Sequence, residues 1–170
     1  MSLVISARLL CYVAAAGSAA LLLGAFIFQA LGYAPCAMCI WQRYPHVVAI
    51  AAGALVLLGL PFVLSALAGA MSAATTSAIG IFHTGVERDW WEGPSSCTGS
   101  GIDLMSVSDL LPGASSEPKT LVMCDKVVWE FLTLSMASWN AVFSAGFATL
   151  WVCAIFARRA VSRQEGLKET

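Results

Sequence analysis

Charged side chains are scarce in this 170-residue chain. Asp, Glu, Lys and Arg together make up 11% of it, and apolar residues make up 59%, whereas soluble domains average roughly 25% charged residues. This composition excludes an ordinary water-soluble globular domain. An excess of positive charge is also missing, because nine basic residues stand against ten acidic ones. The chain therefore lacks the basic surface with which a nucleic-acid-binding protein displaces phosphate counterions, so we expect no nucleic-acid partner.

The few charges leave three windows without Asp, Glu, Lys or Arg, at 9–42, 44–86 and 131–157. A charge at mid-bilayer costs about 2.5–3.5 kcal/mol, and a spanning helix needs about 20 residues. The outer windows each accommodate one helix, and the middle window accommodates two, separated by a turn at Gly59-Leu60-Pro61. We therefore predict an all-α membrane protein of one domain (1–170), a four-helix transmembrane bundle. Its expected spans are 9–31, 41–60, 63–85 and 134–157, with outer loops at 32–40 and 86–133.

The distribution of charge predicts the orientation in the membrane. An even number of spans places both termini on one side, and the basic residues near them mark that side as cytoplasmic: Arg8, Arg158, Arg159, Arg163 and Lys168. The segment 87–130 carries eight acids and three bases, so we expect the long loop outside, in the periplasm of a bacterial host. A cleaved signal peptide is the alternative for the first hydrophobic run. That run continues to Leu31, beyond the usual 7–15-residue signal core, so a retained helix is expected.

The long outer loop is punctuated by Gly and Pro, and its apolar residues at 102–111 allow two interpretations. They can form a short helix on the membrane surface, or a loop folded against the ends of the bundle. Four tryptophans near the outer boundary are expected to form an aromatic belt: Trp41, Trp90, Trp91 and Trp129.

Four of the six cysteines fall in the expected outer segments. Cys36-Ala37-Met38-Cys39 is a C-x-x-C directly before the second span, and Cys97 and Cys124 lie in the long loop. Thiols in an oxidising compartment become disulfides. Two other interpretations stay open: a loop disulfide that is only structural, or a zinc site of four thiolates, although a zinc ribbon would carry a second C-x-x-C.

Arg43 favours a redox role for the C-x-x-C. It lies one helical turn after Cys39 and is the only charged residue between Arg8 and Glu87. A guanidinium and a helix N-terminus both lower the pKa of a thiol, so Cys39 is expected to be a stable thiolate and a good leaving group. The alternative without a functional role is that the Arg43 side chain extends to the membrane–water interface, where its charge stays in water. His83, near the outer end of the third span, is a candidate site residue or a packed interfacial histidine.

Several motifs together resemble those of the bacterial disulfide bond formation protein B (DsbB) family. They are PCAMCIWQR at 35–43, FHTGVE at 82–87 leading to Trp90-Trp91 and Cys97, Cys124-Asp125, and WEFL and LSMASWN at 129–140. The resemblance covers all four spans and both outer loops. It implies an inner-membrane thiol:quinone oxidoreductase that reoxidises a periplasmic DsbA-like thioredoxin-fold oxidase and reduces ubiquinone or menaquinone from the membrane pool.

The resemblance also implies roles for individual residues. Cys97 would be attacked by the partner, Cys124 would then attack Cys36, and the released Cys39 thiolate would donate charge to the quinone, with Arg43 beside the ring. His83 matches a histidine near the quinone. The family can have an acid before the arginine, but this chain has Gln42, which puts a base role at that position in doubt.

Cys11 and Cys153 have no counterpart in that mechanism and are expected to be packing residues near the cytoplasmic face. Two rival functions remain. One is a tetraspan scaffold with purely structural disulfides, and the other is a reductase that receives electrons from cytosolic thioredoxin through Cys11 and Cys153.

Overall fold

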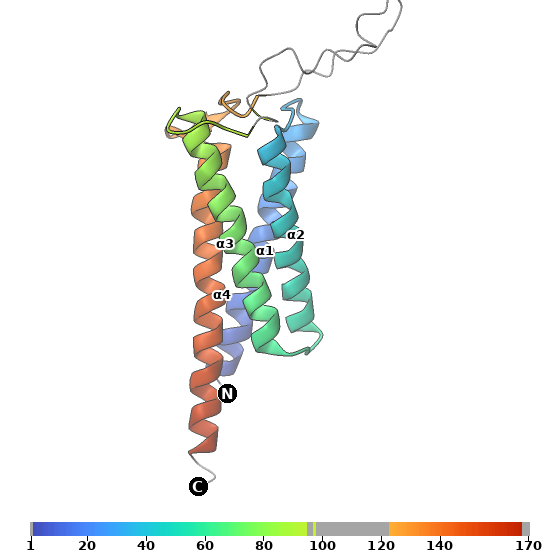
Figure 1. Cartoon of the computed structure of the whole chain (residues 1–170). Coiled ribbons are helices and arrows are strands. Elements are labelled where there is room, and N and C mark those ends of the chain that lie inside the picture. The colour runs from blue at the N-terminus through green and yellow to red at the C-terminus, as the bar shows by residue number, and fades with distance from the viewer. Residues whose placement is uncertain (1, 95–96, 98–122, 168–170) are drawn as a thin grey trace, which may run out of the picture.

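Four helices form the structure, a computed structural model that describes residues 2–94, 97 and 123–167 (Figure 1). They are α1 (Ser2–Ala30), α2 (Ala37–Leu57), α3 (Phe62–Glu87) and α4 (Met136–Gly166). Both α1 and α3 pack against α2 and α4. The all-α bundle expected from the sequence is therefore present. The apolar segment at 102–111 lies outside the described residues.

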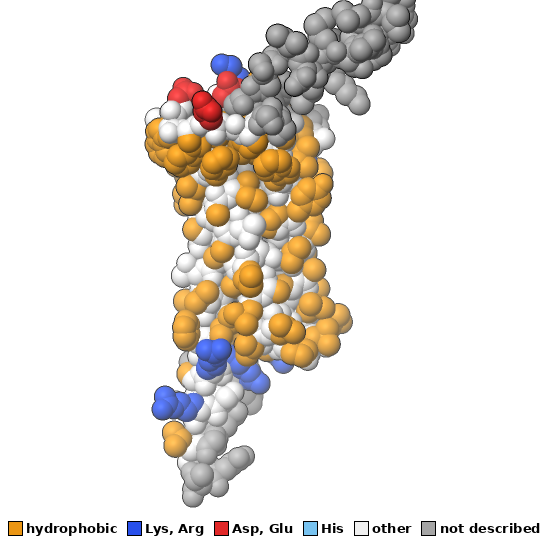
Figure 2. Space-filling model, in the orientation of Figure 1, with side chains coloured by type: hydrophobic (Ala, Val, Ile, Leu, Met, Phe, Trp, Pro, Cys, Tyr) orange, Lys and Arg blue, Asp and Glu red, His pale blue; other side chains and the backbone are white. Residues whose placement is uncertain are grey.

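Three of the helices are long and apolar enough to cross a membrane, over Ala7–Ala30, Phe62–Glu87 and Met136–Gln164. The second helix does not reach the same mean hydropathy, because its first half carries Gln42, Arg43 and His46. Figure 2 shows many apolar side chains on the flank of the bundle, acidic side chains together with a basic one at the loop end, and basic side chains at the other end.

Glycine and proline set the boundaries of α2. Gly32, with φ of +99°, ends the turn after α1, and Gly59, with φ of +77°, lies in the short link between α2 and α3. Pro61 immediately precedes α3. A positive φ is the left-handed region that favours glycine, so these turns are encoded locally.

A two-stranded hairpin before α4 was not predicted from the sequence. Strand β1 (Glu130–Phe131) pairs antiparallel with β2 (Leu134–Ser135). Ser135 then caps α4, because its hydroxyl oxygen accepts a hydrogen bond from the Ser138 backbone N–H at 3.2 Å. The same hydroxyl donates to the Glu87 carboxylate at the end of α3, which ties the ends of α3 and α4 together.

Small side chains fill much of the interior. Alanines from all four helices pack around the fully buried Trp151 of α4, and Gly69 of α3 lies directly against the Trp151 ring. Small residues allow the helices to approach closely, which is the usual way in which helices associate in a membrane.

Candidate functional site

The C-x-x-C lies at the first turn of α2, at the loop end of the bundle. Cys36 is the N-cap residue, and its sulfur accepts a hydrogen bond from the backbone N–H of Cys39 at 3.2 Å. The Cys36 thiol in turn donates to Cys39 Sγ, 2.8 Å away. Cys36 is buried and Cys39 is half-buried. The helix turn therefore holds two thiols close enough to interconvert between dithiol and disulfide.

This hydrogen bond makes the two thiols unequal. It lowers the pKa of Cys39, whose thiolate it stabilises, and the Arg43 charge acts more weakly in the same direction. The same hydrogen bond and burial raise the pKa of Cys36. Cys39 is thus the thiolate of the pair and Cys36 is the protonated thiol.

The second cysteine pair packs directly on the first. Cys97 and Cys124 form a disulfide with their Cα atoms 5.0 Å apart, and the Cys124 N–H donates to the Cys97 carbonyl at 3.2 Å. Both are buried in one apolar cluster with Cys36, Met38 and Val86. Residues that lie far apart in the sequence are thereby brought into one sulfur-containing cluster.

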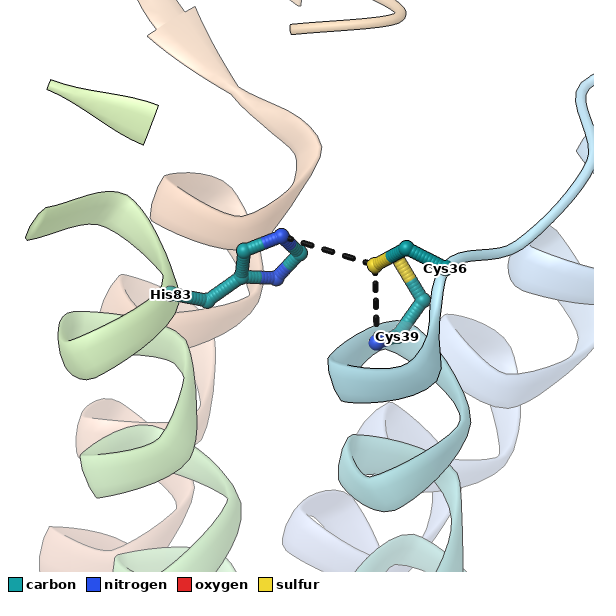
Figure 3. A group of neighbouring side chains, drawn as sticks. All are labelled: Cys36, Cys39 and His83. Atoms are coloured by element: carbon teal, nitrogen blue, oxygen red, sulfur yellow. Dashed lines mark hydrogen bonds between the residues drawn. The ribbon is translucent and has the colours of Figure 1, made fainter. Parts of the chain in front are cut away.

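His83, on α3, faces the sulfur atoms at the start of α2 (Figure 3). Its Nε2 lies 3.6 Å from Cys36 Sγ and 3.8 Å from the carboxylate of Glu87, one helical turn further along. The backbone of Cys124 also lies close to the His83 ring. It thus contacts both cysteine pairs.

A chain of polar side chains crosses the bundle behind His83. Gln42 Nε2 lies 3.0 Å from His83 Nδ1, and Asn140 Nδ2 donates to Gln42 Oε1 at 2.6 Å. Asn140 Oδ1 lies 2.8 Å from His46 Nε2. Thr76 supports the chain by donating to the Gln42 carbonyl at 3.0 Å. These contacts fix the orientation of the His83 ring.

Arg43 points toward α1. Its guanidinium donates to Gln29 Oε1 at 2.6 Å and to the Ala25 carbonyl at 3.4 Å, and it lies 4.9 Å from the centre of the Phe26 ring. The charge is therefore held in place beside the cysteines by hydrogen bonds and a cation–π contact.

A cavity of about 490 Å³ opens beside the cysteines. Apolar residues of α1 and α4 form much of its wall, and α2 and α3 contribute Cys36, Cys39, Arg43, His46 and His83. Cavities of roughly 300–1,000 Å³ with apolar walls and a few polar groups are typical small-molecule sites. Arg43, whose Nε–H has no hydrogen-bond partner among the described residues, can donate to a carbonyl oxygen of a flat ligand, so the residues present fit a quinone.

The remaining cysteines lie apart from this site. Cys11 is buried in the core near Trp151, and Cys153 is exposed on α4; both are free thiols.

Of the boundary tryptophans, Trp129 lines the cavity and contacts Phe28, with ring centres 5.3 Å apart. Trp91 stacks on Phe82, with ring centres 5.7 Å apart.

Sequence reasoning missed two site residues, Glu87 and Asn140. Both carried a signal, because Glu87 lies four residues after His83, one helical turn along, and Asn140 is a polar residue inside a charge-free window. For Gln42, the sequence predicted no contact; it showed only that a glutamine stands where the family can have an acid. The structure places all three in contact with each other or with His83.

The fold and this arrangement define a helical membrane protein whose cysteine pairs gather at one end of the bundle. A protein-family model described as "Disulfide bond formation protein DsbB" matches residues 7–154. The chain therefore belongs to the DsbB family, and the resemblance read from its motifs is confirmed. Membership supports a general role as a disulfide-forming oxidoreductase. Comparisons with curated proteins and with solved structures gave no significant match.

Proposed function

We propose that the protein is a bacterial inner-membrane thiol:quinone oxidoreductase. It reoxidises a periplasmic DsbA-like dithiol oxidase and passes the electrons to ubiquinone or menaquinone. The observation that carries this proposal is the burial of Cys36, Cys97 and Cys124 in one cluster, whose C-x-x-C lines the 490 Å³ cavity. A loop disulfide and a small-molecule site are thereby connected through sulfur atoms.

Electrons enter in two thiol–disulfide exchanges. A thiolate of the partner attacks Cys97, which breaks the Cys97–Cys124 bond and releases Cys124 as a thiolate. Cys124 then attacks Cys36 of a closed Cys36–Cys39 disulfide, forming a Cys36–Cys124 bond and releasing the Cys39 thiolate. Cys39 is the better leaving group because its pKa is the lower of the two.

Two further exchanges restore the loop disulfide. The second thiolate of the partner attacks the partner's own sulfur in the mixed disulfide, so the partner leaves oxidised and Cys97 is released. Cys97 then attacks Cys124 and frees Cys36. The net result is one new disulfide in the partner, an intact Cys97–Cys124 bond and a reduced Cys36/Cys39 pair.

The reduced pair delivers its electrons at the cavity. A bound quinone supplies the acceptor for two electrons and two protons, and Cys36 and Cys39 close into a disulfide again. Arg43 holds a positive charge at the cavity wall, and the apolar side chains of α1 and α4 exclude water. His83 lies between Cys36 and Glu87 and holds the thiol end of the site in place.

The orientation proposed for the protein places the two cysteine pairs of the site on the periplasmic side and both termini in the cytoplasm. Acidic residues at the loop end and basic residues at the opposite end support it (Figure 2), because positive charge is retained on the cytoplasmic side.

Quinone reduction by the purified protein tests the proposal. With reduced partner and either ubiquinone or menaquinone, we expect quinone reduction that Cys36→Ser abolishes and Cys11→Ser preserves. Absence of turnover with both quinones would contradict the proposal. A scaffold would keep its biological function in Cys36→Ser, and a reductase would lose its function in Cys11→Ser.

A further inference from the structure

We propose that the reduced Cys36/Cys39 pair and His83 form a binding site for a thiophilic divalent cation of the zinc class. The two sulfur atoms and a ring nitrogen of His83 all lie within 4.8 Å of one another (Figure 3). Two thiolates and one imidazole are a common ligand set for Zn²⁺. The site is distinct from the four-cysteine zinc site considered from the sequence, because Cys97 and Cys124 are joined in a disulfide.

The distances come close to those of a tetrahedral site. With Zn–S near 2.3 Å and Zn–N near 2.0–2.1 Å, neighbouring ligand atoms lie about 3.5–3.8 Å apart. Cys36 Sγ and His83 Nε2 are 3.6 Å apart, whereas the two sulfur atoms, at 2.8 Å, must separate by about 1 Å. Only Cys39, which is half-buried and lines the cavity, has to rotate.

Glu87, next to His83, can supply the fourth ligand after a shift of its side chain. Its carboxylate lies 3.8 Å from His83 Nε2, and its side chain is 7% exposed. The hydrogen bond from Ser135 fixes one carboxylate oxygen and leaves the other facing the histidine. Cys39 is already the thiolate of the pair, so only the thiol proton of Cys36 leaves to solvent as the ion binds, and binding involves no change in oxidation state.

The polar chain behind His83 can support the tautomer that a metal requires. A metal at Nε2 needs the ring proton on Nδ1, and Gln42 must then present its amide oxygen there. Rotation of the Gln42 amide by 180° exchanges its oxygen and nitrogen within the same outline, with loss of the hydrogen bond that Gln42 Nε2 donates to the Met38 carbonyl at 3.3 Å, and Asn140 can rotate in the same way. Gln42 is thus a positioning residue for the ion, in the place where metal-bound histidines commonly have a carboxylate or carbonyl.

An ion bound in this way would inhibit the proposed reaction, since both sulfur atoms that must form the disulfide would be ligands. Binding itself requires only the reduced dithiol. It can therefore be tested on chemically reduced protein, whether or not the protein transfers electrons to a quinone.

Cobalt binding to the full chain tests the proposal. The background variant replaces Cys11, Cys97, Cys124 and Cys153 by Ala, which leaves Cys36 and Cys39 as the only thiols. After reduction, we expect one Co²⁺ per chain, a thiolate-to-cobalt charge-transfer band, tetrahedral ligand-field bands, and loss of these bands when Zn²⁺ is added. The same protein with Cys36–Cys39 oxidised should bind none.

Two substitutions in this background test whether His83 and Gln42 take part in the metal site or whether Co²⁺ binds to the two thiolates alone. Loss of a residue that only hydrogen-bonds a metal ligand typically weakens metal binding by roughly 10- to 100-fold. His83→Ala removes a ligand itself, so it should weaken Co²⁺ binding by more than that. Gln42→Glu should tighten binding, because a carboxylate accepts the Nδ1 proton permanently, whereas Gln42→Ala should not. A gain of affinity cannot arise from misfolding. Absence of Co²⁺ binding to the reduced background, or unchanged affinity in both His83→Ala and Gln42→Glu, would overturn the proposal.

Discussion

At the scale of single residues, one hydrogen bond decides which sulfur of the C-x-x-C carries the negative charge. The Cys36 thiol donates to Cys39, and the Cys39 N–H donates back to the Cys36 sulfur. The sequence predicted a thiolate at Cys39 from Arg43 and the helix N-terminus. In the structure the thiol of Cys36 has the largest effect, and Arg43 has a smaller one.

We expect Cys39 of the reduced protein to react with iodoacetamide faster than Cys36 at neutral pH. Because its pKa is lowered, Cys39 stays a thiolate at pH values where an ordinary thiol is protonated, and its reactivity is lost only as the pH falls through that lowered pKa. Cys36 should react only at higher pH, because its pKa is raised. Mass spectrometry of the labelled peptides across a pH series measures both profiles.

Cys36→Ala is the matched control for this labelling experiment. It removes the hydrogen-bond donor, so the reactivity profile of Cys39 should shift to higher pH. Identical profiles for the two thiols, or a Cys39 profile that does not change in Cys36→Ala, would contradict the assignment.

The cysteines could be predicted from the sequence, whereas their polar surroundings could not. A C-x-x-C is a local pattern within one helical turn. The contact between Asn140 and Gln42 joins residues of different helices, 98 positions apart in the chain, and depends on how α2 and α4 face each other. The position of Glu87 likewise depends on tertiary structure, because its hydrogen bond with Ser135 requires the end of α3 to lie beside the start of α4.

At the scale of the elements, the charge-free windows correspond to four helices, although α1 and α4 extend beyond them to Ser2 and Gly166. The link between α2 and α3 lies at Gly59-Leu60-Pro61, since a positive φ and a proline both act locally. The hairpin before α4 is different. Its strands have two residues each, and it is held by hydrogen bonds from Arg88 to the Thr133 carbonyl and from Trp139 to the Phe131 carbonyl.

Gly69 is expected to be essential for the packing of α3 on α4. A Cβ atom at this position would overlap the buried Trp151 ring, so Gly69→Ala should destabilise the protein by about 1–3 kcal/mol. Thermal unfolding in detergent, followed by circular dichroism, measures the loss.

Gly146→Ala provides the comparison, because within the part of the chain that the structure describes a Cβ atom there meets nothing within 4 Å. The higher helix propensity of alanine should leave stability unchanged or raise it by up to about 1 kcal/mol. Equal effects of the two substitutions would show that the contact between Gly69 and Trp151 has no special importance.

At the scale of the whole molecule, the four helices and the segment before α4 line the open cavity together, so its walls come from several separate parts of the chain. No local pattern could predict it. The sequence did predict that Cys39 and Arg43 would lie near each other, but the contribution of α1 to the cavity depends on the assembled bundle.

Gly24→Leu should obstruct the cavity. Gly24 lines it, and a Cβ atom there meets no atom of the described residues within 4 Å, so a leucine side chain can occupy the space proposed for the quinone. We expect the KM for quinone to rise or turnover to be lost, while thiol–disulfide exchange with the partner is unchanged. Steady-state quinone reduction and a stopped assay of partner oxidation separate these two steps.

Gly146→Leu adds the same bulk in open space outside the cavity and should leave quinone reduction unchanged. If Gly24→Leu reduced quinone as fast as the unmodified protein, the cavity would not be the quinone site.

Both cysteine pairs and the cavity lie at the loop end of the bundle, whereas alanines and glycines pack closely around Trp151 further along it. Under the proposed function, reducing equivalents therefore arrive and depart on the same face of the bilayer. Each cycle would be electrically neutral, moving no net charge between the two compartments. Its rate should consequently be insensitive to membrane voltage.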